Sequence, residues 1–393
     1  MRNIRKSRLA VVLAALVTLA ATISARAEEV IKVGLSVPLS GSAANWGRGV
    51  DWMCKKAAEE IKAAGGIKVK GKAYNIECLA YDNKYTAADG IKVAQTLLNR
   101  DGVKYIYVLG TAPILATQSI TERQGVMLFN TSWGMSSKGP KFPLTISVDN
   151  SPNEIMPALI KYLTQTFPQA KTMVILNAND ATGREAEATA RPMWEKAGMK
   201  ILTSDFYERG TTEFQPIAAR LVSFKPDMVD LSTVPMADAG QVFKELDALG
   251  FKGIKVTDNG TGADAIIATG GTTVNGVYMG ASMTFDGAST TEHQRKVNDE
   301  YFATFNESLG LPQISGYDAI YMLKAGAEKA QSIDPKDVAA VLETTTFRTF
   351  YGGEAGFGGK EIYGVNSQPM LPVYITQLTD GKLIEKARIV PTN

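Results

Sequence analysis

Short apolar segments alternate with amphipathic segments along most of this 393-residue chain. The apolar segments have the length of buried strands, and the amphipathic ones repeat their apolar residues at helical spacing. In the first third we expect strands at 31–37, 74–81, 105–109 and 127–130, and helices at 47–63, 87–98 and 117–123. Buried strands that are separated by helices predict a parallel sheet with helices on both faces.

The alternation starts again after residue 150, which predicts a second sheet of the same kind. We expect helices at 152–166, 183–197, 214–223 and 237–249, and strands at 171–176, 200–206, 228–231 and 254–256. The last quarter differs, since it predicts three successive helices at 292–305, 315–329 and 335–345. A glycine-rich segment at 351–359 follows, and then two strands at 372–378 and 383–390, joined by an Asp380-Gly381 turn.

These patterns predict an α/β fold of two Rossmann-like lobes, each a parallel sheet covered by helices. The three late helices need a sheet to cover, so we expect them to return to the first lobe and the final strands to complete the second. This path gives three crossover segments, near 146–150, 276–286 and 350–357. The predicted lobes comprise 28–146 with 284–352, and 147–283 with 353–393.

The first 27 residues have the pattern of a secretory signal peptide. Four basic residues between positions 2 and 8 precede an apolar stretch at 9–23, and Ala25-Arg26-Ala27 provides a small-x-small cleavage site. The stretch is shorter than the roughly 20 residues that span a bilayer, so a membrane anchor is the less favoured alternative. We expect cleavage near Ala27 and export of a soluble chain to the periplasm.

Removal of that segment changes the charge balance. The whole chain has 42 basic and 40 acidic residues, a formal net charge of +2. The segment holds five basic residues and no acidic one, which leaves 37 basic against 40 acidic residues and a net charge of −3. Without a large basic excess, nucleic-acid binding is disfavoured. With one histidine and two cysteines, we expect no metal site and no cofactor.

Motifs of common enzymes are absent from the sequence. It has no G-x-G-x-x-G loop, no P-loop and no G-x-S-x-G nucleophile motif. Asp180, Asp258 and Asp264 would suit a hydrolase that uses a pair of carboxylates, but helix caps and turns explain them more simply. We therefore expect a protein that is not an enzyme, with a carboxylate-dependent hydrolase as the alternative.

The two cysteines are predicted to face each other. Cys54 falls on the apolar stripe of the helix at 47–63, and Cys78 falls on one face of the strand at 74–81. Both side chains then point into the contact between that helix and that strand. Export places them in an oxidising compartment that permits a disulfide. We predict a Cys54–Cys78 disulfide, with two buried free thiols as the alternative.

Loops at the carboxyl ends of strands hold the candidate binding residues, because ligands of open α/β sheets bind there. Small hydroxyl residues and glycines recur in these loops, at 40–47, 110–117, 130–134, 180–183, 233–235 and 258–260. Backbone N–H groups at helix starts suit a carboxylate, and tryptophan supplies an apolar face. Trp46 and Trp133 each precede a glycine in such a loop, which favours a binding role for both over core packing.

Several segments resemble a known family in sequence and in order. They are VGLSVPLSG with NWG, KKAAEEIKAAGGI, YDNKYTAADGIKVAQTLL, YVLGTAPILATQ, SGYDAIYML and the glycine-rich segment at 351–359. Together they resemble the extracytoplasmic solute-binding proteins of ABC transporters, in the branched-chain amino-acid (leucine/isoleucine/valine-binding) family. The resemblance implies a type I periplasmic-binding-protein fold that closes on a small ligand and delivers it to an inner-membrane permease with its ATPase. Free diffusion between capture and delivery favours a monomer.

The resemblance also assigns site residues in the first lobe. Trp46 matches the family's aromatic residue after the first strand, which implies that it covers the ligand. Amino-acid binders of the family use a serine in the loop after the third strand. This chain has Ile114 at the matching position, followed by Leu115 and Ala116.

The next assignments concern the loop after the fourth strand and the second lobe. Thr131 and Ser132 fit the family's backbone contacts, and Trp133 stands where a threonine is used. In the second lobe, Thr182 stands where the family has an aromatic residue, and Pro235 lies in a further strand-end loop.

The position that pairs with a ligand's ammonium group decides the expected cargo. Asn259 matches the family's acidic residue there, and a slip of one position in the alignment would put Asp258 in that role. A buried ammonium group without a carboxylate partner is strongly unfavourable. We therefore expect an aromatic or aliphatic carboxylic acid without an amino group, held between the two tryptophans and Ile114. A branched-chain or aromatic amino acid is the main alternative, and an amide or urea-like solute is another.

Overall fold

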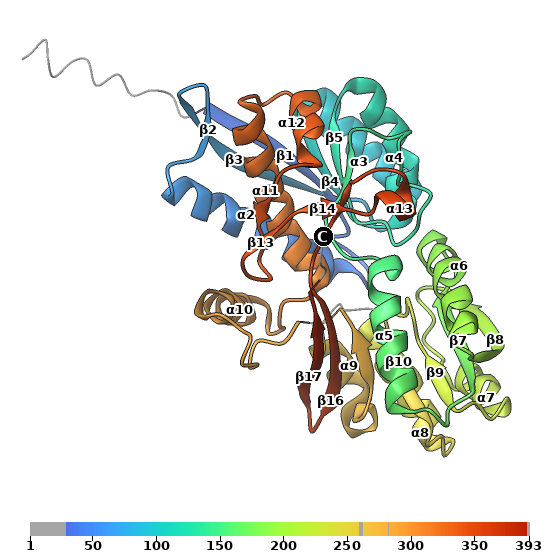
Figure 1. The fold of residues 1–393 in the computed structure, drawn as a ribbon. Helices are drawn as coiled ribbons and strands as arrows, with labels where there is room; N and C mark the ends of the chain where they lie inside the picture. Colours follow the sequence, from blue (N-terminus) through green and yellow to red (C-terminus); the bar gives the residue numbers. More distant parts are fainter. Residues whose placement is uncertain (1–28, 259–261, 282, 391–393) are drawn as a thin grey trace, which may run out of the picture.

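The computed structural model describes residues 29–258, 262–281 and 283–390 (Figure 1). These residues form two large sheets, each covered by helices, as the alternating pattern predicted. The predicted signal peptide lies outside the described residues. Within the described ranges, no helix combines the length and the apolar character that a membrane span requires.

The first sheet has six strands in the order β2-β3-β1-β4-β5-β6, parallel except for the β2/β3 pair. The strands are β1 (Glu29–Val37), β2 (Ile67–Val69), β3 (Lys72–Asp82), β4 (Tyr105–Val108), β5 (Met127–Asn130) and β6 (Thr145–Ser147). The accompanying helices are α2 (Ala44–Ala63), α3 (Ala87–Gln95, continued by a π turn at Thr96–Arg100), α4 (Thr111–Gln124), α10 (Glu292–Phe305), α11 (Leu311–Ala330) and α12 (Pro335–Leu342).

The second sheet has seven strands in the order β17-β16-β11-β10-β9-β7-β8. The strands are β7 (Thr172–Ala178), β8 (Lys200–Tyr207), β9 (Met228–Asp230), β10 (Ile254–Thr257), β11 (Tyr278–Gly280), β16 (Val373–Thr379) and β17 (Lys382–Ile389). The helices are α5 (Pro152–Thr166), α6 (Ala181–Lys196), α7 (Gln215–Ser223), α8 (Met236–Ala248) and α9 (Asp264–Gly270). β16 and β17 are antiparallel, and the predicted Asp380-Gly381 turn joins them.

Each sheet has a hydrophobic core on both faces. Val33 and Leu35 of β1 belong to the cluster that α2 and α11 complete, whereas Leu97 and Ile114 cover the opposite face. The second sheet is built in the same way, with one cluster under α7, α8 and α9 and another under α5 and α6. Burial of these strands on both faces explains their nearly continuous apolar sequences.

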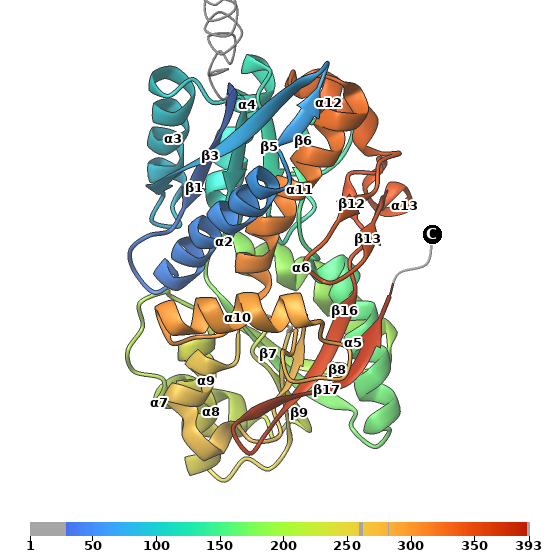
Figure 2. The same ribbon diagram turned by 90° about the vertical axis from the view of Figure 1, so that its left-hand side faces the viewer.

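The chain passes between the lobes three times. It leaves the first sheet after β6, returns to the helices of the first sheet after β11, and enters the second sheet again at β16. Small elements precede that last passage: β12 (Phe347–Arg348), β13 (Glu354–Ala355), β14 (Phe357–Gly358), α13 (Lys360–Tyr363) and β15 (Gln368–Pro369). α10 lies where the two lobes meet (Figure 2). The lobe boundaries given above remain a prediction.

Two local features bear on the site. The predicted Cys54–Cys78 disulfide is confirmed, and it joins α2 to β3. Helix α4 begins at Thr111 rather than near Thr117, directly after Gly110, whose φ of 107° favours glycine. Because α4 starts early, residues 111–117, which were expected in a loop, form the first part of the helix.

Candidate ligand-binding site

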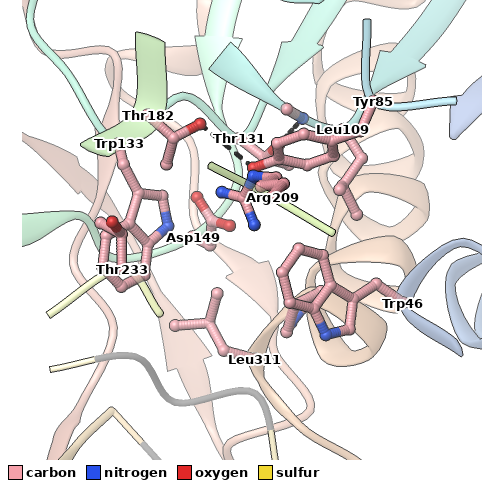
Figure 3. A pocket seen from close by; sticks show the side chains of 12 residues that line it. Trp46, Tyr85, Leu109, Thr131, Trp133, Asp149, Thr182, Arg209, Thr233 and Leu311 are labelled. Carbon is pink, nitrogen blue, oxygen red and sulfur yellow. Dashed lines mark hydrogen bonds between the residues drawn. The ribbon is translucent and has the colours of Figure 1, made fainter. Parts of the chain in front are cut away.

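A cavity lies between the lobes, at the carboxyl ends of their strands (Figure 3). It contains about 470 Å³ of space that protein atoms do not fill, part of which is continuous with solvent. Both lobes contribute to the lining, which consists of Trp46, Tyr85, Leu109, Gly110, Thr131, Trp133, Asp149, Thr182, Arg209, Thr233, Leu311 and Pro312. The arrangement can enclose one small molecule.

Trp46 and Thr182 reach the cavity from helix starts of the same design. Each is in the first turn of its helix, α2 or α6, and each precedes a glycine. A Cβ atom on Gly47 would lie 1.9 Å from the carbonyl oxygen of Pro38, and one on Gly183 would lie 2.0 Å from that of Ala178. Glycine therefore lets both helices start tight against the strand end.

Tyr85 links the two lobes across the cavity. Its hydroxyl lies 3.1 Å from Oγ1 of Thr182, and its ring packs edge-on against Trp46 with 5.8 Å between the ring centroids. Burial raises the pKa of Tyr85, so the phenol stays neutral and provides a hydrogen-bonding hydroxyl. The lobes are thus in contact around a closed site.

The loop after β5 forms the opposite wall with Trp133. Thr131 Oγ1 donates to the carbonyl of Val108, at 3.0 Å, and fixes this loop to the end of β4. A Cβ atom on Gly134 would lie 1.2 Å from Oε2 of Glu185 in the second lobe. The glycine after Trp133 therefore allows the second lobe to approach closely.

Arg209 brings a positive charge into the cavity from the loop after β8. Its Nε donates to Asp180, and its guanidinium lies 4.9 Å from the centroid of the Tyr85 ring. Asp180 also accepts from the N–H of Gly183, at 3.0 Å, so one carboxylate caps α6 and holds the arginine. Nη1 of Arg209 is buried and has no hydrogen-bond partner among the described residues. A buried unpaired guanidinium N–H is unfavourable, so this atom marks a position for an oxygen of a ligand.

Asp149 places a carboxyl group in the same cavity, just after β6. The residue is 4% exposed, and Figure 3 shows its carboxyl group among the lining side chains. Burial raises the pKa of Asp149 to about 8, with Lys138 lowering it and Glu154 raising it. Burial therefore favours the protonated form of this carboxyl group in the ligand-free site.

Of the residues predicted from sequence, the structure brings Trp46, Thr131, Trp133 and Thr182 together around the cavity. Ser132 is buried beside them, and its N–H donates to Asn130 Oδ1 at 2.8 Å.

The other predicted residues lie elsewhere or are not described. Ile114 packs in the core between the first sheet and its helices, because α4 starts early and turns it inward. Leu115 is 37% exposed, and Ala116 and Pro235 are not part of the lining. Asn259 lies outside the described residues. We therefore leave Ile114, Leu115, Ala116 and Pro235 out of the proposed ligand contacts, and the role of Asn259 stays a prediction.

Asp258, the alternative ammonium partner, is also outside the lining. It is fully buried, and its Oδ2 accepts from Ser232 Oγ at 2.9 Å. Burial raises the pKa of Asp258 to about 7. The second lobe therefore does not present this carboxylate to the cavity.

Sequence reasoning missed Tyr85, Asp149, Arg209 and the start of α11. Because ligands of open α/β sheets bind at the carboxyl ends of strands, the first three could have been found, since they follow β3, β6 and β8. The loop that holds Arg209 was treated as a connector, and the three-residue β6 was not recognised as a strand. Leu311 and Pro312 were missed because α11 begins four residues before the predicted Ser315.

Comparison with known proteins agrees with this architecture. The profile of the periplasmic binding protein family matches residues 30–382. The leucine-, isoleucine-, valine-, threonine- and alanine-binding protein of Pseudomonas aeruginosa is 25% identical over 341 residues, which are 85% of this chain and 87% of that protein.

Solved structures show the same fold. A solute-binding protein of an ABC transporter from Rhodopseudomonas palustris, in complex with 3,4-dihydroxybenzoic acid, superposes with a TM-score of 0.77 at 21% identity, covering 93% of this chain and 99% of that one. The branched-chain amino-acid-binding protein of Streptococcus pneumoniae, in complex with isoleucine, has a TM-score of 0.74 at 18% identity, covering 93% and 100%. With two lobes, three passages and a family profile that spans nearly the whole described chain, this protein belongs to the periplasmic binding protein family, whose members bind solutes for ABC transporters.

Proposed function

We propose that this chain is the periplasmic substrate-binding component of an ABC importer and that it captures a small carboxylic acid with an apolar body, preferably an aromatic acid without an amino group. It would act as a monomer and deliver the acid to a permease driven by its ATPase. The observation that carries the choice of ligand is the unpaired Nη1 of Arg209 in a cavity walled by aromatic rings.

Three features support an acid. A guanidinium group binds a carboxylate through charge-assisted hydrogen bonds. The starts of α2, α4, α6 and α11 all contribute residues to the lining, and helix N-termini favour an anion. The rings of Trp46, Tyr85 and Trp133 offer flat apolar surface to the rest of the ligand.

An amino acid is the second candidate, and one specific observation favours it. Asp149 places a carboxyl group in the cavity with Arg209, and an ionised Asp149 would suit an ammonium group. Relatives with bound or named amino acids have the same fold. What separates the candidates is whether the cavity requires an ammonium group on the ligand.

A matched ligand panel tests this choice. Benzoate, 3,4-dihydroxybenzoate, phenylalanine, leucine and benzamide would be screened by thermal shift and then titrated by calorimetry at pH 7. A ligand at 100 times its Kd raises stability by about 2.7 kcal/mol, which a melting curve resolves. We expect the two benzoates to bind and benzamide, which lacks the carboxylate, to bind at least 100-fold more weakly.

Two results would contradict the proposal. Binding of leucine or phenylalanine without binding of either benzoate would establish the amino-acid candidate. Conversion of a bound compound during long incubation, followed by chromatography, would establish the hydrolase alternative instead of a carrier.

A further inference from the structure

Asp149 is the one carboxyl group among the residues that line the cavity. Its backbone carbonyl accepts from Gln368 Nε2 at 2.7 Å, which fixes the residue at the first passage between the lobes. The carboxyl group therefore faces the ligand space from a rigid position.

Lys138, the cation that lowers the pKa of Asp149, is engaged elsewhere. Its Nζ donates to Ser151 Oγ and to Gln368 Oε1, both at 3.0 Å, and lies 4.5 Å from the centroid of the Tyr363 ring. Glu154 accepts from Ser151 Oγ and from the Tyr363 hydroxyl, each at 2.7 Å, and so belongs to the same buried network. Lys138 is thus held by neutral groups beside another acid and does not provide Asp149 with a direct ion pair.

The charges that face Asp149 come from several elements and do not leave a spare cation. Lys138 from the loop after β5 and Glu154 of α5 act directly on the Asp149 carboxyl group, and Asp149 acts on the hydroxyls of Tyr85, Tyr107 and Tyr351. Arg209 and its partner Asp180 act on the same Tyr85, and Glu185 of α6 acts on the same Lys138. The two cations therefore already interact with three other carboxylates, Arg209 with Asp180, and Lys138 with Glu154 and Glu185. An ionised Asp149 and an anionic ligand would place two like charges in one closed cavity, which is unfavourable.

We propose that Asp149 determines specificity for acids by keeping its proton in the liganded site and donating a hydrogen bond to the ligand's carboxylate, while Arg209 supplies the positive charge. This inference rests on the proposed function, because it assumes that the cargo is an acid. A protonated carboxyl group offers an O–H donor to an anion, whereas an ammonium group would require its ionised form. The same residue therefore accepts acids and excludes amino acids.

A proton balance follows from this arrangement. The pKa of Asp149 is about 8 in the free site, and a bound anion raises it further. Binding therefore takes up about half a proton from solvent at pH 8, and the uptake approaches one proton at pH 9.5. Because only the protonated fraction is competent, the Kd of benzoate should be about 30-fold higher at pH 9.5 than at pH 6.

Calorimetry with benzoate across this pH range is the test, with Asp149→Asn as the matched variant. The amide also donates a hydrogen bond but does not titrate. We expect Asp149→Asn to weaken the binding of benzoate less than tenfold at pH 6. The variant should also lack the rise in the Kd of benzoate at high pH. Titrations at pH 8.5 in buffers of different ionisation enthalpy should show uptake of about 0.8 proton by the wild type and of none by the variant.

A ligand-free measurement gives an independent readout. The carboxyl group ionises near pH 4 in the unfolded chain and near pH 8 in the folded one. Its contribution to stability is therefore present below pH 4 and is lost as pH rises toward 8. Asp149→Asn should melt several degrees above the wild type at pH 7.5 and show a smaller difference at pH 4.5.

The outcomes separate this inference from the proposed function. A Kd for benzoate that does not change between pH 6 and pH 9.5 would overturn the inference and leave the proposed function intact. The same rise in Asp149→Asn would also overturn it, since the titrating group would be Lys138 or a tyrosine. Binding of leucine but not benzoate, lost in Asp149→Asn, would reject both, because Asp149 would then be the ionised partner of an ammonium group.

Discussion

The helix starts at Trp46 and Thr182 have the same backbone arrangement, but one carries a large aromatic side chain and the other a small hydroxyl side chain. Each glycine that follows them allows a helix to begin against the end of a strand, at Pro38 in the first lobe and at Ala178 in the second. The first lobe fills this position with a large ring, whereas the second places a small hydroxyl there. The small residue leaves space for the Tyr85 hydroxyl to reach across.

The two lobes also differ in the walls that they give to the cavity, which we call the first wall (first lobe) and the second wall (second lobe). The first lobe supplies the rings and most of the apolar surface, from Trp46, Tyr85, Leu109 and Trp133. The second lobe supplies Arg209, which Asp180 holds in place. The first wall therefore gives shape and apolar contact, and the second gives charge. Four changes test this division.

The largest effect should come from the disulfide, which joins the elements that carry the first wall. Cys54 is on α2, after Trp46, and Cys78 is on β3, which leads to Tyr85. The bond closes a loop with a sequence separation of 24, so its loss should lower the free energy of unfolding by about 3 kcal/mol. Denaturant unfolding of Cys54→Ala/Cys78→Ala would measure this loss.

Reduction provides the control for that measurement. Dithiothreitol should lower the unfolding midpoint of the wild type and leave that of the double variant unchanged. If reduction shifted both proteins equally, the disulfide would not be the cause.

The next largest effect should come from the charge of the second wall. Arg209→Met keeps much of the apolar stem but removes the guanidinium group, so we expect a loss of at least 100-fold in affinity for benzoate. Arg184→Met is the matched control, since Arg184 is exposed on the same lobe and is not part of the lining. Calorimetry should find the control within twofold of the wild type. Similar losses in both variants would mean a general electrostatic effect.

The two walls were not equally visible in the sequence. Trp46, Thr131 and Trp133 follow strands whose apolar sequences are plain, so the rule about strand ends located them. Most helices and strands were located for the same reason, because burial on both faces leaves a strong pattern. Ile114 was misplaced because the helix that contains it starts at Thr111, and a loop that becomes a helix changes which side chains face the ligand.

The charged groups were missed for a different physical reason. Arg209 is positioned by Asp180, at the start of helix α6, and by Tyr85 of the other lobe. Neither contact is visible in the sequence around Arg209. Asp149 lies at a passage between lobes, where the short β6 has no periodicity to read. Local hydrophobic patterns encode which residues are buried in a lobe, but not how two lobes meet.

A smaller effect should come from the rings of the first wall. Trp46→Ala removes a large apolar contact, so we expect benzoate affinity to fall by about 10- to 30-fold. The loss should be the same at pH 6 and pH 8, since the ring carries no charge. Trp52→Ala is the control, because Trp52 packs on Tyr301 away from the cavity. An unchanged affinity in Trp46→Ala would remove this residue from the site.

The smallest effect should come from the contact that joins the walls. Tyr85→Phe and Thr182→Val each remove one partner of the 3.1 Å contact between the two hydroxyls. Each should weaken binding about threefold to tenfold, chiefly through faster dissociation, because the hydrogen bond joins the two lobes across the cavity. The double variant should lose little more than either single variant, which corresponds to a coupling of about 1 kcal/mol. Additive losses would mean that the two side chains act on the ligand separately. The helix starts at Trp46 and Thr182 would then differ only in the space that their side chains fill, and not in a contact between the lobes.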